Sequence, residues 1–164
     1  MLDNFSTRAR QIVFAARFKA GERGAAVIDF DDFIHALILE DQGMLENVFS
    51  KFYGGQGTLV NRGPSHVPFF SSKIAKHLLA NLEEDLRQSQ PVSLTTEIPL
   101  SRSLEPAFNS AKAFQTRFQH SQIEPLHLLV AILSGEASQG VKLLQDSGIT
   151  EENVLLALSR VAKN

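Results

Sequence analysis

The sequence predicts an all-α domain of about eight helices, arranged as two similar four-helix repeats. The apolar stretch Ile28–Leu39 recurs 95 residues later as Ile123–Leu133, and in each copy an acidic residue directly follows the first isoleucine. The same offset holds without a gap from Phe5 to Phe49 of the first copy. A register that stays constant over about 45 residues indicates an internal repeat.

The two recurring stretches are expected to be the central helices of the repeats. Ile28–Leu39 is apolar on most faces of a helix, so it is expected to lie in the interior. Asp29 and Glu124 stand just before the apolar runs, where a carboxylate suits the free N–H groups and the helix dipole. Pro125 falls in the first turn of the second helix, where proline loses no hydrogen bond. We expect both helices to share one core.

The other helices follow from apolar residues at helical spacing and from capping residues at the boundaries. Ser6 is expected to cap a helix over Thr7–Lys19, which Gly21 and Gly24 end. The remaining expected elements are a helix from Met44 to Phe52, a helix over Lys73–Arg87 capped by Ser71 or Ser72, a helix capped by Ser101 that carries Leu104 to Phe118, a helix over Gln139–Ser147 and a last helix opened by Thr150.

We expect one domain over residues 1–164, because neither repeat is large enough to bury its apolar faces well alone. Repeat one covers residues 1–89 with a loop insertion over 54–70, a polar linker covers 90–99, and repeat two covers 100–164. A loop as long as the 54–70 insertion is usually functional or mobile. Val67, Phe69 and Phe70 near the end of the insertion have two open interpretations: they cover the core between the repeats, or they form a partner surface.

Composition argues against several function classes. A net charge of −2 gives no basic footprint for nucleic acid. The chain has no cysteine, which excludes disulfides and thiolate zinc sites. Its start lacks the apolar run of a signal peptide, and no window reaches the roughly 18 apolar residues of a membrane span. We therefore expect a cytoplasmic protein without nucleic-acid or membrane partners.

The residue patterns predict neither catalysis nor a metal or cofactor site. His120, Glu124 and His127 form H-x-x-x-E-x-x-H, but the cap position of Glu124 places His120 before the helix, so the three need not share a face. The acidic run Glu83–Asp85 points around a helix, and no G-x-S-x-G motif is present. The glycine-rich run over 54–58 lacks the lysine of a P-loop. We expect a protein that is not an enzyme.

Several stretches resemble a known family. F-S-T-R-A-R near the start, V-I-D-F-D-D-F-I-H-A-L-I and V-F-S-K-F are similar to one Clp repeat. H-L-L-V-A-I-L, followed by V-K-L-L-Q-D-S-G-I, is similar to a second. Two such repeats form the N-terminal domain of Clp-type AAA+ unfoldases. The resemblance covers nearly the whole chain, and it includes no part of the ATPase module of those proteins. It implies eight helices in two pseudo-symmetric halves.

The resemblance also implies candidate ligand residues. In some relatives the repeats bind phosphorylated arginine through a threonine before the first helix and a glutamate at the start of the central helix, and this chemistry suits helix-start donors and a carboxylate. Ser6 stands at the threonine position and Asp31 at the glutamate position. In the second repeat Ser101 keeps the hydroxyl, but Leu126 replaces the carboxylate. Alternatively, Asp31 only stabilises the N-terminus of its helix.

Two non-catalytic functions follow from the resemblance. The first is a protein-interaction module that binds substrate proteins or adaptors for a Clp-type unfoldase or protease, through apolar grooves between helices. The alternative is a standalone accessory subunit that regulates the assembly of a Clp protease complex. The expected partners are thus protein substrates or adaptors, together with a Clp AAA+ unfoldase or protease core.

Overall fold

The computed structural model describes residues 2–45, 67–85, 98–135 and 138–161, and this part of the chain contains seven α-helices and no strand. The all-α fold class is confirmed. The helices are α1 (Thr7–Glu22), α2 (Phe30–Asp41), α4 (Ser72–Asp85), α5 (Leu104–Arg117), α6 (Pro125–Leu133), α7 (Gln139–Asp146) and α8 (Glu151–Ser159). Most of the helix expected from Met44 to Phe52, residues 54–66 of the loop insertion and most of the linker lie outside the described residues. No described helix is both long and apolar enough to cross a membrane.

Short polar side chains begin most of these helices. The Ser6 hydroxyl accepts a hydrogen bond from the Ala9 N–H at 3.1 Å and so caps α1, as predicted. α1 continues to Glu22, three residues beyond the expected end, because the helix accommodates Gly21 in its interior. Gly24 then takes a φ of 70°, a left-handed conformation that favours glycine, and the chain leaves the helix there.

The start of α5 corrects one prediction. Its N-cap is Ser103, which makes no side-chain capping hydrogen bond, and Ser101 is not the cap. The chain first makes a turn in which the Leu104 N–H donates to the Ser101 carbonyl at 3.1 Å. The Ser101 hydroxyl instead donates to Asp29 Oδ1 in the other half of the molecule, at 3.3 Å. A tertiary contact has therefore replaced a local cap.

Two equivalent backbone contacts join the halves. Phe5 forms a parallel bridge with Ile123, and Leu100 forms one with Ile28. The N–H of Ser6 donates to the Ile123 carbonyl at 3.0 Å, and the N–H of Ser101 donates to the Ile28 carbonyl at 2.9 Å. Leu100 and Ile123 follow Phe5 and Ile28 by 95 residues each, so the molecule makes the same contact twice with the roles of its halves exchanged.

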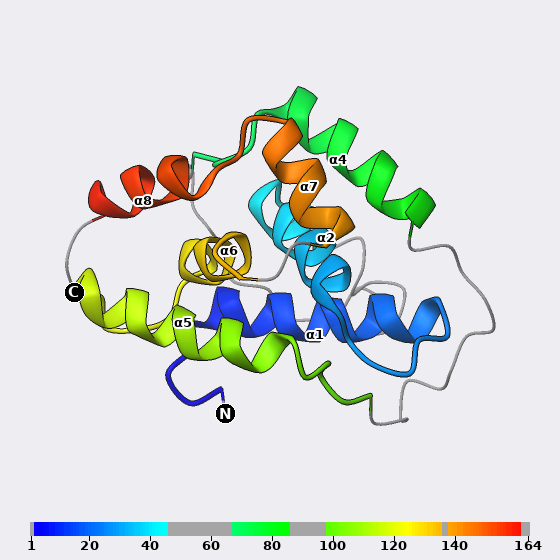
Figure 1. Ribbon diagram of the computed structural model, residues 1–164, viewed down its shortest axis with the longest axis horizontal. Helices are drawn as coiled ribbons and strands as arrows, with labels where there is room; N and C mark the ends of the chain where they lie inside the picture. Colours follow the sequence, from blue (N-terminus) through cyan, green and yellow to red (C-terminus); the bar gives the residue numbers. More distant parts are fainter. Residues whose placement is uncertain (1, 46–66, 86–97, 136–137, 162–164) are drawn as a thin grey trace.

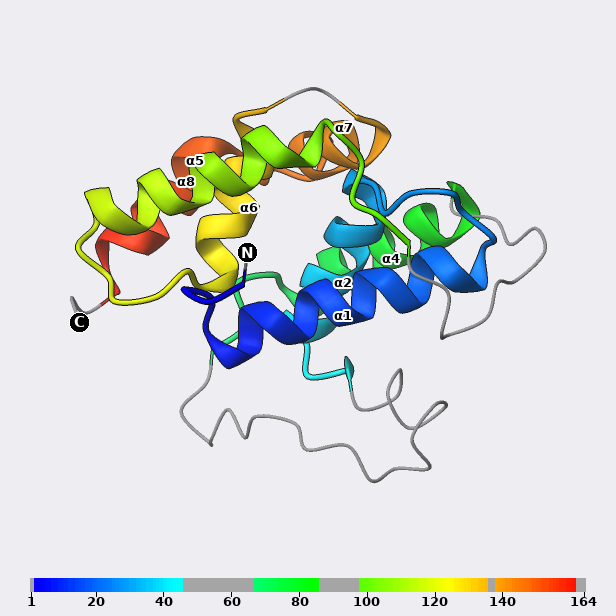
Figure 2. The ribbon, with the colours of Figure 1, turned by 90° about the horizontal axis from the view of Figure 1, so that it is seen from below.

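α2 and α6 lie at the centre of one core. α2 packs against α1, α4 and α7, whereas α6 packs against α5 and α8, and the two central helices also touch each other (Figures 1 and 2). Phe33 of α2 is 0% exposed and its counterpart Leu128 of α6 is 1% exposed. The Phe108 ring of α5 meets Phe33 and Phe5 edge-on, with centroids 5.4 and 5.8 Å apart. Apolar side chains from both halves thus form a single cluster.

Candidate functional groove

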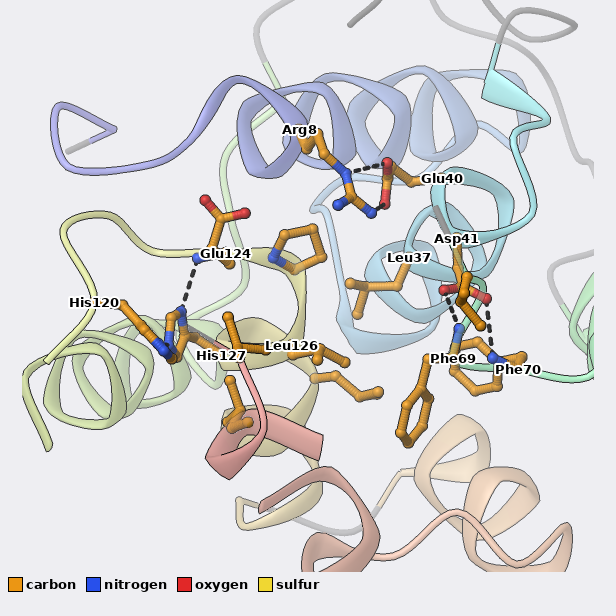
Figure 3. Close-up of a pocket in the computed structure, with 15 residues that line it drawn as sticks. Arg8, Leu37, Glu40, Asp41, Phe69, Phe70, His120, Glu124, Leu126 and His127 are labelled. Atoms are coloured by element: carbon orange, nitrogen blue, oxygen red, sulfur yellow. Dashed lines mark hydrogen bonds and ion pairs between the residues drawn. The ribbon is translucent and has the colours of Figure 1, made fainter. Parts of the chain in front are cut away.

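A groove of about 370 Å³ opens where the two halves meet (Figure 3). Its walls come from the start of α1, the end of α2, the segment before α4, the start of α6 with its preceding turn, and the end of α8. Its lining residues are Arg8, Leu37, Glu40, Asp41, Val67, Phe69, Phe70, His120, Glu124, Pro125, Leu126, His127, Leu129, Leu158 and Val161. Because no single element supplies the groove, it exists only once the halves have packed together.

The groove has an apolar floor and an exposed apolar rim. Leu129 and Leu158 are 2% and 1% exposed and belong to the core. Val67 and Val161 on the rim are 82% and 42% exposed. A large exposed side chain next to an apolar hollow is unfavourable in water and favours a bound apolar group.

Asp41 holds the segment before α4 against the groove. Its Oδ1 accepts a hydrogen bond from the Phe69 N–H at 2.7 Å, and its Oδ2 accepts one from the Phe70 N–H at 3.0 Å. Phe70 is buried in the core, whereas Phe69 is half-buried and Val67 is exposed. The end of the loop insertion therefore both covers the core and borders the groove. Its use as a partner surface stays a prediction.

An ion pair crosses from α1 to α2 at one side of the groove. Arg8 Nε and Nη2 donate to the two carboxylate oxygens of Glu40, each at 2.8 Å. Burial lowers the pKa of Arg8, but the hydrogen bonds and charge of Glu40 outweigh burial and raise it overall. The planar guanidinium matches a carboxylate with two parallel bonds, so this geometry is specific as well as strong.

Glu124 lies on the same side of the groove as Arg8 (Figure 3). Burial raises the pKa of its carboxyl, while the charge of Arg8 and a hydrogen bond with Ser6 oppose that rise. Glu124 takes part in no ion pair within the part of the chain that the structure describes. Among the described residues, Glu124 is therefore a half-buried groove carboxylate that has no ion-pair partner.

Two histidines next to Glu124 form a hydrogen-bonded chain (Figure 3). The Glu124 N–H donates to His127 Nδ1 at 2.8 Å, so the proton of the neutral His127 ring is on Nε2. His127 Nε2 lies 2.8 Å from His120 Nδ1 and donates to it. His120 then carries its proton on Nε2, which is buried and has no partner among the described residues. Burial, reinforced by His120, lowers the pKa of His127 to about 4.

The H-x-x-x-E-x-x-H pattern thus brings its two imidazoles together through a hydrogen bond. Among the described residues, no group of three potential metal ligands converges. Sequence reasoning missed both this histidine pair and the Arg8–Glu40 pair. The histidine pair could have been predicted, because His120 and His127 lie only seven residues apart, on either side of the start of a helix. The Arg8–Glu40 pair could not, because its residues lie 32 apart and no local pattern connects them.

The predicted ligand residues Ser6, Asp31 and Ser101 do not line the groove. Ser6 is 6% exposed and caps α1, and Ser101 donates to Asp29. The structure does not bring the three onto a common partner. Each is engaged in a contact that joins or caps elements of the fold.

Asp31 caps α7, a helix of the other half. Its Oδ1 accepts from the Gly140 N–H at 2.9 Å and from the Ser138 hydroxyl at 3.2 Å. Burial raises the pKa of Asp31 in spite of these bonds. A Cβ at Gly140 would overlap the Asp31 carboxylate and lie 2.8 Å from Ile34 Cδ1, so any larger residue there would displace the Asp31 side chain from α7. Phosphoarginine recognition stays a prediction, and it would require Asp31 to exchange α7 for a guanidinium.

Comparison with known proteins agrees with this architecture. Residues 71–147 match the family model described as the Clp repeat (R) N-terminal domain. No curated protein matches the chain in sequence.

Solved structures resemble the chain over nearly its whole length. The N-terminal domain of the caseinolytic protease associated chaperone ClpD from Arabidopsis thaliana is 15% identical, with a TM-score of 0.64 over 96% of this chain and 94% of that one. A chain from a malarial protein secretion system is 18% identical, with a TM-score of 0.69 over 96% and 93%. The Hsp104 N-terminal domain from Candida albicans is 16% identical, with a TM-score of 0.59 over 96% and 91%. At these identities the likeness establishes the fold.

Proposed function

We propose that this chain, a Clp repeat N-terminal domain, is a non-catalytic module that binds exposed apolar segments of proteins in the groove between its repeats. Domains of this fold are generally protein-interaction modules of Clp unfoldases. The bound segments would belong to substrate proteins, or to adaptors that deliver them to a Clp AAA+ unfoldase or protease core. We place this activity in the cytoplasm and assign it no cofactor.

The exposed apolar rim next to an apolar hollow carries the proposal. Val67 and Val161 border the groove while remaining exposed to solvent. Covering such side chains stabilises a complex by roughly 25 cal/mol for each Å² of apolar surface removed from water. Grooves between helices are a recurring way to bind amphipathic or extended segments. The groove is shaped by side chains that are already held by Asp41 and by the core, so little ordering is needed on binding.

Three polar side chains around the groove hold elements of the fold together. Glu40 is engaged by Arg8, and Asp41 is engaged by the backbone of Phe69 and Phe70. His127 has both ring nitrogens in hydrogen bonds. Glu40, Asp41 and His127 therefore serve to position the groove walls, which suits a preformed binding groove.

A binding experiment tests this function. The domain, its Val67→Asp variant and a matched Val27→Asp variant are immobilised and exposed to a chemically unfolded client protein. Val27 is 36% exposed and does not line the groove. We expect Val67→Asp to weaken client binding about tenfold, because a charge on the rim opposes apolar burial, and Val27→Asp to have little effect.

The same experiment separates the alternative function, an accessory subunit that regulates the assembly of a Clp protease complex. Purified unfoldase rings and assembled protease core are tested beside the client. Binding to the core alone, with no binding to the unfolded client, would exclude the client-binding function and favour the accessory role. Equal client binding by all three forms would show that the groove is not the binding site.

A further inference from the structure

We infer that the groove selects protein segments that carry a cationic group next to apolar side chains, with Glu124 as the carboxylate that receives the cation. This inference rests on the proposed function, and it specifies which segments that function favours.

The charges around the groove do not balance. Among the described residues, the lining contains the carboxylates of Glu40, Asp41 and Glu124 and, as cations, only the guanidinium of Arg8. The Nε and Nη2 groups of Arg8 both donate hydrogen bonds to the Glu40 carboxylate. The lining therefore has an excess of negative charge, and a cation in the groove would reduce it.

Glu124 is the carboxylate best placed to receive that cation. Asp41 uses an oxygen for each of two backbone N–H groups, and Glu40 is bound on both oxygens by Arg8. Glu124 has a hydrogen bond with Ser6 and feels the charge of Arg8, but it has no ion pair among the described residues. It is half-buried, so a cation bound there would be screened less than one at an exposed carboxylate.

A second feature indicates that the ligand also has a peptide backbone. His120 lines the groove and is 3% exposed, and its Nε2 has no hydrogen-bond partner among the described residues. The bonds from Glu124 to His127 and from His127 to His120 place a proton on this nitrogen. A buried N–H without an acceptor is unfavourable, and a peptide carbonyl would supply one if the His120 ring turned its Nε2 toward the groove. An apolar floor, a donor and a carboxylate together suit a short extended segment.

The cation has three possible sources: a lysine ammonium, an arginine guanidinium and the α-amino group of a chain end. All three share a positive charge with N–H donors, which is the chemistry that Glu124 recognises. Peptides that differ only at this group distinguish them. One apolar peptide sequence is made with Lys, Arg, Gln or Glu at its centre, each with a free or an acetylated N-terminus.

Fluorescence anisotropy with the full 164-residue chain measures the affinity for each peptide. We expect the Lys and Arg peptides to bind about tenfold tighter than the Gln peptide at low salt, because a charge-assisted hydrogen bond in a half-buried site is stronger than a neutral one. The Glu peptide is expected to bind weakest. In Glu124→Gln the preference for a cation should fall to about twofold or less, while Glu84→Gln, an exposed position on α4, should keep it.

The possible failures are distinct. If the Gln peptide binds as tightly as the Lys and Arg peptides in the wild-type chain, and Val67→Asp weakens them all, then the groove binds apolar segments and the inference about charge is wrong. If no peptide binds, the proposed function fails as well. The comparison of peptides on the wild-type chain does not depend on any variant folding, and circular dichroism checks that Glu124→Gln is folded.

Discussion

The N-termini of α2 and α6 occupy equivalent positions in the two repeats, but different chemistry stabilises them. Asp32 Oδ2 accepts a hydrogen bond from the Asp29 N–H at 2.9 Å, and His127 Nδ1 accepts one from the Glu124 N–H at 2.8 Å. Asp32 and His127 are 95 residues apart and both are 0% exposed. The same backbone donor is therefore satisfied by a carboxylate in one repeat and by an imidazole in the other.

The second partner of each side chain marks the larger difference. Asp32 is held by Arg23 through two hydrogen bonds of 2.9 and 2.7 Å. His127 is held by His120, whose Nε2 ends the chain without a partner among the described residues. The first repeat thus closes its cap with an ion pair, whereas the second leaves a polar donor at the groove. The two helix starts therefore have the same backbone geometry but different side chains. The candidate groove lies beside the second one, where the hydrogen-bond network ends at an unpaired His120 nitrogen among the described residues.

The largest expected effect tests whether the two central helices contribute equally. Phe33→Ala and Leu128→Ala should each lower the free energy of unfolding by about 3–5 kcal/mol, because both remove buried atoms and leave a cavity. Urea unfolding measures both, with Phe14→Ala as the control since Phe14 is 51% exposed. A loss under about 1 kcal/mol at either position would mean that this repeat does not depend on its central helix.

A smaller effect should separate the two caps. Asp32→Asn keeps an acceptor for the Asp29 N–H but removes the charge that pairs with Arg23, so we expect a loss of about 2–3 kcal/mol. His127→Asn also keeps an acceptor and breaks no ion pair, so we expect about 1 kcal/mol. Equal losses in urea unfolding would show that the ion pair adds nothing beyond the capping hydrogen bond.

The most gradual effect concerns the dependence of stability on pH. The pKa of His127 falls to about 4 in the folded protein from an ordinary value of 6.5, so the unfolded chain takes up a proton first as the pH falls. Its contribution to stability is present above pH 6.5 and is lost between pH 6.5 and about 4, by at most about 1.4 kcal/mol per pH unit.

Unfolding free energies of the wild type and of His127→Asn, measured from pH 4 to 7.5, check this prediction. The pKa of His35 is also lowered, mainly by burial, but His35 is present in both proteins. The difference between the two profiles therefore reports on His127 together with its hydrogen-bond partner His120. Parallel profiles would show that His127 titrates normally in the folded protein.

Local patterns were sufficient for the elements of this fold. Helical spacing and capping residues placed α1, α2 and α6, and the repeat register related the contacts that Phe5 and Leu100 make across the halves. The helices depend on hydrogen bonds and side chains within about four residues of one another, which a sequence displays directly, whereas the contacts across the halves form only on packing. Two predictions were wrong: α1 continues past Gly21, and Ser101 does not cap α5, because its hydroxyl donates to Asp29, 72 residues earlier in the chain.

The sequence by itself determined the all-α class, the central pair of helices and the repeat. Only the tertiary structure decided the groove, because its walls come from both halves and from segments far apart in the chain. The Arg8–Glu40 pair spans 32 residues, and the bond from Gly140 to Asp31 spans 109. Contacts at such separations depend on how the helices pack, and no local periodicity encodes them. The same packing leaves Glu124 half-buried without an ion pair among the described residues, whereas the sequence predicted only a helix cap there.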